Sequence, residues 1–214
     1  MILAPHEIEA ESFRLIDEEF RRRQWTFAEE VLPLVKRVVH ATGDVDLARE
    51  LVFHPQAVPA GLEALCAGAD LVTDVQMVAV GISRRLAEPL GVEVSCHLND
   101  PEVVARARES GLTRAYHAME KALSLPGEKV VVIGNAPTAL LAVLDHLDRG
   151  GRPPALVIGV PVGFVGAAEY KERLASRDVP HITLRGTRGG TPVAVALTNA
   201  LLKLACERCD CHDT

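Results

Sequence analysis

The sequence predicts an α/β fold, a Rossmann-like three-layer arrangement in which a mostly parallel sheet carries helices on both faces and is preceded by N-terminal helices. From residue 51 onward, short apolar runs alternate with helical patterns, as they do in parallel sheets. The last three apolar runs share one layout, in which a Gly- and Pro-rich turn leads into a helix. The chain has 214 residues, of which 48% are hydrophobic and 4% aromatic, and this fits one globular domain. We expect that domain over residues 1–205 and a Cys-rich tail over residues 206–214.

The N-terminal part of the chain has a helical pattern. Phe13, Ile16 and Phe20 recur at i, i+3 and i+7, the spacing of one helix face. Ser12 falls beside this apolar stripe, where its hydroxyl group needs a hydrogen-bond partner.

A second helix is expected to end near residue 41. Residues 26–29 have the spacing of a capping box, which places the helix start there. Pro33 belongs either to the first turn of this helix or to a kink, and Gly43 is suited to the left-handed conformation that stops a helix.

The remaining elements alternate. Strands are expected at 51–53, 71–73, 92–96, 129–133, 156–160 and 181–184, and helices near 58–67, 102–109, 114–124, 138–148, 165–176 and 193–205. In a parallel sheet, the turns that follow the last three strands meet at the carboxyl edge, where ligands bind in such folds. We therefore expect the functional site at that edge.

Several classes of protein are disfavoured by composition and motifs. Asp and Glu total 29 and Lys and Arg total 23, which gives a net charge of −6 and argues against a nucleic-acid partner. The chain has no dinucleotide or P-loop fingerprint, no nucleophile elbow and no HExxH helix. The longest uncharged stretch, residues 155–168, is shorter than the roughly 18 residues of a membrane span. We expect a cytoplasmic protein with no membrane partner.

The five cysteines do not suggest a disulfide framework. Cys66 and Cys96 stand alone in apolar surroundings, which favours reduced, buried thiols. The tail offers ligands for a soft metal, but a second pair of ligands is missing, so no metal site is assigned. The residues of that tail are Cys206, Cys209, Cys211 and His212.

Two residues have positions that suggest chemistry. His40 lies near the C-terminus of its expected helix, where the dipole favours the imidazolium form and hence a proton donor. Arg114 follows Thr113 at an expected helix start, where a cation opposes the dipole unless an anion binds. A structural histidine and a solvated arginine stay open as alternatives. Arg84 and Arg188 lie near glycine turns, and arginine pairs well with the carboxylates of a polycarboxylate ligand.

Seven strings of the sequence together resemble the signature blocks of the precorrin-8X methylmutase family, which includes the cobalt-precorrin-8 methylmutases. They occur in order and cover the chain from residue 11 to residue 190. The strings are Glu11 to Phe13, Arg37 to Asp44, Thr73-Asp74 with Met77-Val78 and Gly81-Ile82, Thr113-Arg114, Gly134 to Leu140, Gly159 to Val165, and Arg188 to Gly190.

This resemblance implies a function in corrin biosynthesis. The family catalyses an intramolecular 1,5-shift of a methyl group from C-11 to C-12, which gives hydrogenobyrinate or cobyrinate, and it uses no separate cofactor. The resemblance also implies a homodimer of α/β fold with the substrate near the subunit interface, His40 as the catalytic residue, and Ser12 and Arg114 in the site. The other candidate substrate-binding residues are Thr73, Asp74, Arg84, Asn135 and Arg188.

The sequence leaves two alternatives open. The first is a non-catalytic corrinoid-binding or carrier protein, which would bind the same tetrapyrrole polycarboxylate without turnover. The second is a nucleotide-dependent α/β enzyme, which would need a phosphate motif that the sequence lacks. Both the metal-free and the cobalt-containing macrocycle stay open as substrates, because the ring and its arms present the same contacts in either form.

Overall fold

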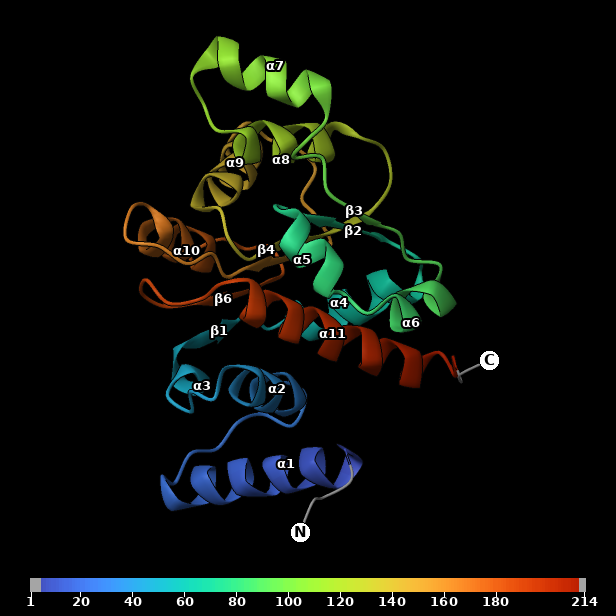
Figure 1. The fold of residues 1–214 in the computed structure, drawn as a ribbon, viewed down its shortest axis with the longest axis vertical. Helices are drawn as coiled ribbons and strands as arrows, with labels where there is room; N and C mark the ends of the chain where they lie inside the picture. The colour runs from blue at the N-terminus through green and yellow to red at the C-terminus, as the bar shows by residue number, and fades with distance from the viewer. Residues whose placement is uncertain (1–4, 212–214) are drawn as a thin grey trace.

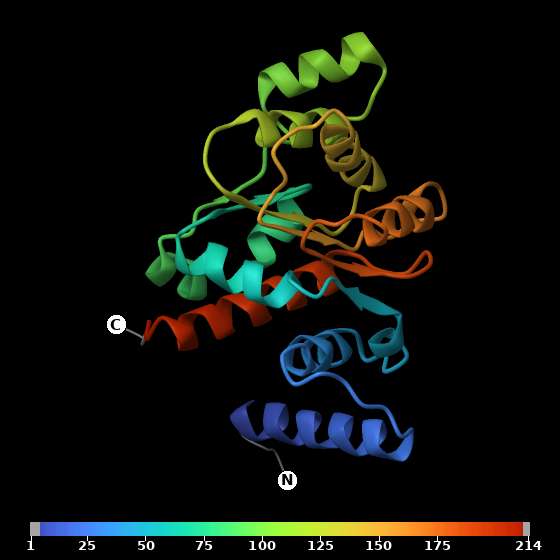
Figure 2. The ribbon, with the colours of Figure 1, turned by 180° about the vertical axis from the view of Figure 1, so that it is seen from behind.

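The computed structural model describes residues 5–211 and has the expected three-layer α/β architecture (Figures 1 and 2). One six-stranded sheet has the order β1-β6-β5-β4-β2-β3. β1 is antiparallel to β6, and every other neighbouring pair is parallel, so the predicted mostly parallel sheet is confirmed. The strands are β1 (Leu51–Phe53), β2 (Asp70–Thr73), β3 (Val94–Ser95), β4 (Lys129–Ile133), β5 (Leu156–Gly159) and β6 (His181–Leu184).

Helices cover both faces of this sheet. One face packs against α2 (Leu32–Thr42), α4 (Ala57–Cys66) and α11 (Thr191–Arg208), and the other packs against α8 (Arg114–Ser124), α9 (Pro137–Asp148) and α10 (Ala167–Ala175). Two helices form outer layers: α1 (Pro5–Arg22) packs on α2, and α7 (Pro101–Ser110) packs on α8. The short elements are α3 (Leu47–Glu50), α5 (Gln76–Gly81), α6 (Arg84–Ala87) and the 3-10 helix η1 (Glu88–Leu90).

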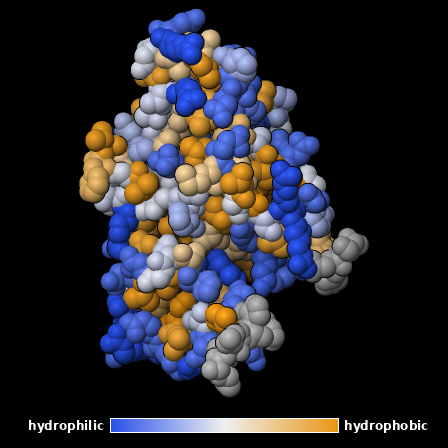
Figure 3. Space-filling model, in the orientation of Figure 1, coloured by the Kyte–Doolittle hydropathy of each residue, from blue (hydrophilic) through white to orange (hydrophobic). Residues whose placement is uncertain are grey.

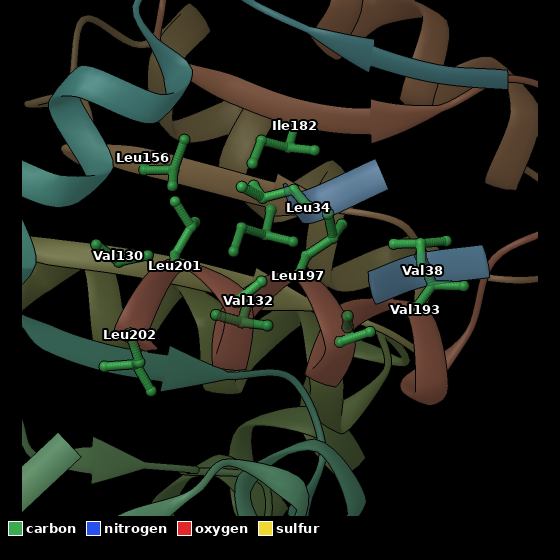
Figure 4. Packing of buried hydrophobic residues seen from close by; sticks show 14 of the residues in the cluster. Leu34, Val38, Val130, Val132, Leu156, Ile182, Val193, Leu197, Leu201 and Leu202 are labelled. Atoms are coloured by element: carbon green, nitrogen blue, oxygen red, sulfur yellow. The ribbon is translucent and has the colours of Figure 1, made fainter. Parts of the chain in front are cut away.

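The core has two parts because side chains along a strand alternate between the two faces of the sheet. In β4, Val130 and Val132 point into the cluster that contains α11, whereas Val131 and Ile133 point into the cluster that contains α9. All four side chains are completely buried. Figure 4 shows the first cluster, in which Leu197 of α11 lies among strand residues and side chains of α2.

The beginning of α2 differs from the prediction. The helix starts at Leu32 after Val31, which makes no side-chain capping bond, so the capping box expected at residues 26–29 is wrong. Residues 29–31 form a turn instead. Pro33 does lie in the first turn, and Gly43, with φ of 66°, ends the helix as predicted.

The cysteines also differ from the prediction. Cys66 forms a disulfide bond with Cys209, so the expected reduced thiol at Cys66 is wrong. The reason is that α11 continues to Arg208, three residues into the segment expected as a tail, and this brings the two Cα atoms to 6.4 Å, a separation that suits a disulfide bond. The structure pairs none of Cys96, Cys206 and Cys211 in a disulfide bond within residues 5–211, and the thiol of Cys206 donates to the carbonyl of Leu86 at 3.2 Å. His212 lies outside the described residues, and within residues 5–211 no cluster of three or more ligating side chains is placed to hold a metal ion.

Candidate functional site

The turns that follow β4, β5 and β6 lie at one edge of the sheet, and backbone hydrogen bonds join the last two of them. The N–H of Gly163 donates to the carbonyl of Thr187 at 3.1 Å, and the N–H of Gly190 donates to the carbonyl of Val160 at 2.8 Å. At Gly189, where φ is 149°, a Cβ atom would lie 2.3 Å from the carbonyl oxygen of Val160. Only glycine permits this approach, so the loops after β5 and β6 form one unit.

Asp74 organises the neighbouring turn, which follows β4. Its buried carboxylate accepts hydrogen bonds from the backbone N–H groups of Gly134 at 3.1 Å, Asn135 at 2.8 Å and Ala136 at 2.7 Å. Burial raises the pKa of Asp74, and the three backbone donors act in the opposite direction. Thr73, also buried, donates to the carbonyl of Ser95 at 3.1 Å. Both side chains are thus used within the fold and hold the edge in shape.

His40 opens into a groove on the same face as α11. It lies in the last turn of α2, as predicted, and its side chain is exposed, with the ring centroid 5.3 Å from that of Phe13 on α1. The groove has a volume of about 460 Å³. In Figure 3, apolar and charged side chains are interspersed over the face of the molecule that carries α2 and α11. The polar or charged residues that line the groove with His40 are Arg37, Ser83, Asn199 and Lys203.

A second hollow of about 350 Å³ adjoins this groove between α1, α2 and α11. The two share Arg37, Ala200 and Lys203, so they form a continuous surface. Arg37 pairs with Glu9 at 2.7 Å, and this hydrogen bond lowers the pKa of the Glu9 carboxyl. The exposed Lys203 also lowers the pKa of Glu9 through its charge, but among residues 5–211 no carboxylate forms an ion pair with it. The groove therefore combines apolar walls with a cation that has no ion-pair partner in the part of the chain that the structure describes.

The sequence did not single out Arg37 or Lys203 as candidate site residues. Arg37 precedes His40 by three residues, a spacing that puts both on one helix face. The helical pattern could therefore have indicated that Arg37 lies beside His40. Lys203 is more than 160 positions away from His40 in the sequence, and only the packing of α11 on α2 brings the two together.

Arg114 occupies the predicted place at the start of α8. Thr113 is the N-cap, and its Oγ1 accepts the N–H of Tyr116 at 3.2 Å. The exposed guanidinium of Arg114 donates to Asn99 Oδ1 at 3.2 Å. Because the hydroxyl groups of Thr113 and Thr138 lie 2.7 Å apart, the N-termini of α8 and α9 are adjacent. Arg114 and the exposed Asn135 therefore belong to the same part of the edge.

The other predicted residues are distributed more widely. Arg84 is exposed on α6 and lines a different hollow together with Cys96. Arg188 is exposed in the loop after β6 and forms an ion pair with Asp44 at 2.6 Å. Ser12 is half-buried on α1, and its hydroxyl group donates to the carbonyl of Ile8 at 2.8 Å, which supplies the partner that the sequence analysis required.

The structure therefore separates the candidates into two groups. Ser12 and His40 belong to helices that pack on each other. Arg114 belongs to α8, and both views of the ribbon place α8 and α2 toward opposite ends of the long axis of the molecule (Figures 1 and 2). Arg114 is not among the residues that line the His40 groove of its own chain.

Comparison with known proteins gives a consistent result. A family profile described as precorrin-8X methylmutase matches residues 7–204. The chain is 42% identical over 205 residues to a cobalt-precorrin-8 methylmutase of Priestia megaterium, with 96% of this chain and 90% of the relative covered. It is 50% identical over 170 residues to a precorrin-8X methylmutase of Pseudomonas aeruginosa, with coverage of 78% and 81%. A solved structure of the Thermus thermophilus precorrin-8X methylmutase superposes with a TM-score of 0.85 at 40% identity and covers 94% of this chain and 98% of that one.

Proposed function

The chain belongs to the precorrin-8X methylmutase family, and from that membership we propose that it is an isomerase of corrin biosynthesis that moves a methyl group from C-11 to C-12 of a precorrin ring. The relatives named above are all methylmutases, and none of those names is that of a carrier protein. The carrier alternative is therefore not supported. The nucleotide-dependent alternative lacks a phosphate motif.

The observation that carries the catalytic proposal is the exposed His40 ring in a groove beside Arg37 and Lys203. The substrate is a conjugated macrocycle with carboxylate arms. Protonation of the macrocycle by His40 changes its conjugation and weakens the bond to the migrating methyl group. The proton is returned after the shift, so the atoms balance as an isomerisation requires. General-acid assistance of this kind contributes about 10² to 10⁴-fold in rate.

Replacement of His40 by alanine tests this role. We expect His40→Ala to abolish methyl migration while the affinity for substrate stays within about tenfold, because the ring supplies a proton rather than the main anchoring contacts. His146→Ala is the matched control. The His146 ring lies in the last turn of α9, does not line the His40 groove, and forms a hydrogen bond with the carbonyl of Arg152 at 3.0 Å. Turnover is followed by the visible spectrum, separately with the metal-free and the cobalt macrocycle. Substantial turnover by His40→Ala would exclude the acid role, and binding without turnover by the unaltered chain would restore the carrier alternative.

We propose that Lys203, for which the structure shows no ion pair within residues 5–211, binds a carboxylate arm of the substrate. A charge-assisted hydrogen bond to such an arm contributes about 1.5–3 kcal/mol. Lys203→Gln is therefore expected to raise the Kd by about tenfold or more while leaving kcat unchanged. Arg208→Gln, which removes an exposed cation from the end of the same helix, should leave the Kd unchanged. If Lys203→Gln and Arg208→Gln bound the substrate equally well, Lys203 would not be a substrate-binding residue.

The working unit in this proposal is a homodimer with shared sites, because α8, which carries Arg114, and α2, which carries His40, lie toward opposite ends of the long axis of one chain (Figures 1 and 2). A second copy can supply Arg114 to that groove, and isologous dimers are the commonest oligomers. Phe164 and Val165, which are 95% and 89% exposed in the loop between β5 and α10, provide apolar surface for such a contact. Ser12 lies on α1, which packs on the α2 of its own chain, so in this proposal Ser12 and His40 come from the same subunit.

Subunit mixing tests the shared site. At a substrate concentration well below the Kd of Arg114→Ala, where His40→Ala is inactive and Arg114→Ala is only weakly active, mixed dimers of the two should be more active than either variant alone, because one of the two sites is then intact. An active monomer in sedimentation at assay concentration would contradict the dimer. An exchanging dimer without recovered activity would contradict the shared arrangement of these two residues.

The proposal also includes a cytoplasmic location without a nucleic-acid partner. The net charge of −6 disfavours general nucleic-acid binding. Within residues 5–211, no helix is long and apolar enough to cross a membrane. Cell fractionation tests the location directly.

A further inference from the structure

Lys171 is a buried lysine that the proposed reaction does not use. It lies on α10 and is only 1% exposed, and within residues 5–211 no carboxylate forms an ion pair with it. Its ammonium group donates to the carbonyl oxygen of Arg188 at 2.6 Å. Burial lowers the pKa of Lys171 to about 8. An apolar side chain of similar length would fill this space without desolvating a charge, so the lysine has to be explained by its contact with Arg188.

That contact fixes the backbone of the glycine-rich loop after β6. The next residue, Gly189, approaches the carbonyl of Val160 more closely than any other residue type allows, and the N–H of Gly190 bonds to the same oxygen. The loop is thus held from α10 on one side and from the end of β5 on the other. The exposed side chain of Arg188 extends from this held backbone.

The Arg188 side chain reaches Asp44, just after the helix that carries His40. The guanidinium Nη1 of Arg188 lies 2.6 Å from Asp44 Oδ2. Asp44 follows Gly43, whose N–H caps α2 by bonding to the carbonyl of Val39 at 2.9 Å. Asp44 also orders the next turn, because its Oδ1 accepts the N–H of Asp46 at 3.0 Å. Three contacts therefore connect the interior of the protein to the end of α2: Lys171 with the Arg188 carbonyl, Arg188 with Asp44, and the N–H of Gly43 with the carbonyl of Val39.

We propose that Lys171 is a positioning residue for His40, acting through the Arg188 carbonyl and the Arg188–Asp44 ion pair to hold the C-terminal end of α2 against the carboxyl edge of the sheet. The inference rests on the proposed function, in which His40 is the acid. A general acid has to lie within hydrogen-bond reach of the atom that it protonates. A displacement of about 1 Å at such a group lowers the rate by about 10²-fold.

Lys171→Met keeps the length of the side chain and removes the ammonium donor. We expect kcat to fall by about tenfold to a hundredfold while KM changes less than about threefold, since the groove cations remain. Lys129→Met is the matched control. Lys129 is likewise buried and donates to three backbone carbonyls, those of Leu125, Pro126 and Gly127, but at the opposite, amino end of β4. That variant should keep the wild-type kcat even where its stability falls.

Asp44→Ala gives a second test that does not depend on a buried substitution. It should lower kcat to a similar extent, Asp44→Glu should restore part of the loss, and the Lys171→Met/Asp44→Ala double variant should lose no more than the larger single loss. The His40 ring signals in NMR provide a readout without substrate: they should shift in Lys171→Met and in Asp44→Ala but not in Lys129→Met. An unchanged kcat in both single variants, or losses that multiply in the double variant, would overturn the inference. An unaltered protein without turnover would overturn the proposed function instead, while the NMR comparison would still test whether Lys171 positions His40.

Discussion

The carboxylate of Asp74 accepts the backbone N–H of Asn135 at 2.8 Å and thereby joins the end of β2 to the turn that follows β4. The same carboxylate also accepts the N–H groups on either side, those of Gly134 and Ala136. One buried carboxylate therefore satisfies three backbone N–H donors of this turn and holds the turn in its conformation. The exposed side chain of Asn135 is presented at the sheet edge as a consequence.

Asp74→Ala should therefore be strongly destabilising. It leaves three N–H donors without an acceptor, two of them bonded at less than 2.9 Å in the intact protein. We expect the free energy of unfolding to fall by roughly 3–5 kcal/mol, the range for breaking a buried charged network. Urea denaturation measures this. Glu88→Ala, an exposed carboxylate at the start of η1, is the control and should change the value by less than about 0.5 kcal/mol. A loss below about 1 kcal/mol for Asp74→Ala would mean that the turn is held by other contacts.

Strand positions were predictable from the sequence because apolar runs bounded by Gly and Pro carry local information. The strands at 51–53, 129–133 and 181–184 and the helix at 114–124 were placed to the residue. The role of Asp74 was not predictable, because its three partners lie 60 to 62 positions away. The same reason explains why the bond between Cys66 and Cys209 was missed, at a separation of 143 residues.

The candidate site shows the same division between local and distant information. His40 was placed correctly by helical periodicity and by the stop at Gly43, both of which are local. The groove in front of it depends on the packing of α1 and α11 against α2, and no sequence pattern reports that packing. The short helices α5 and α6 were not predicted either, because one or two turns produce too little periodicity.

Arg114→Ala should weaken substrate binding by roughly 1.5–3 kcal/mol, the contribution of a charge-assisted bond to a carboxylate arm. In the structure its guanidinium donates to the neutral Asn99, and it forms no ion pair with a carboxylate of residues 5–211. The positive charge is thus available to an anion at the start of α8. Calorimetric titration with substrate measures the effect. Arg106→Ala is the control, because Arg106 already pairs with Glu120. Unchanged affinity on loss of Arg114 would favour the solvated-arginine interpretation.

The pairing of Cys66 with Cys209 predicts a thiol count. The sequence has five cysteines and one disulfide bond uses two of them, so 5 − 2 = 3 thiols should titrate per chain in denaturant without reductant. After reduction the count should rise to five. Cys66→Ser should give four thiols both before and after reduction, because Cys209 then has no partner. A count of five in the unreduced protein would support the reduced thiols that the sequence suggested.

Lys171 also predicts a pH dependence of stability. Burial lowers its pKa from 10.5 to about 8 in the folded protein, whereas in the unfolded chain it stays near 10.5. Below about pH 8 both states hold the proton, so the cost of the buried charge is fully present. Between about pH 8 and 10.5 the unfolded chain binds a proton that the folded chain does not, and the free energy of unfolding therefore rises with pH. The rise for this one group is on the order of 3 kcal/mol.

Lys171→Met isolates this contribution because it removes the titrating group and leaves the others in place. At pH 7 the methionine variant should be at least as stable as the unaltered protein, since it buries no charge. The free energy of unfolding of the unaltered protein should approach that of the variant as the pH is raised from 7 to 10. Urea denaturation of both proteins at each pH measures this difference. A constant difference over this range would show that Lys171 does not lose its proton in the folded state. A lysine kept at the expense of stability, together with a loss of kcat on its replacement, would mark Lys171 as selected for the position of His40 rather than for the strength of the fold.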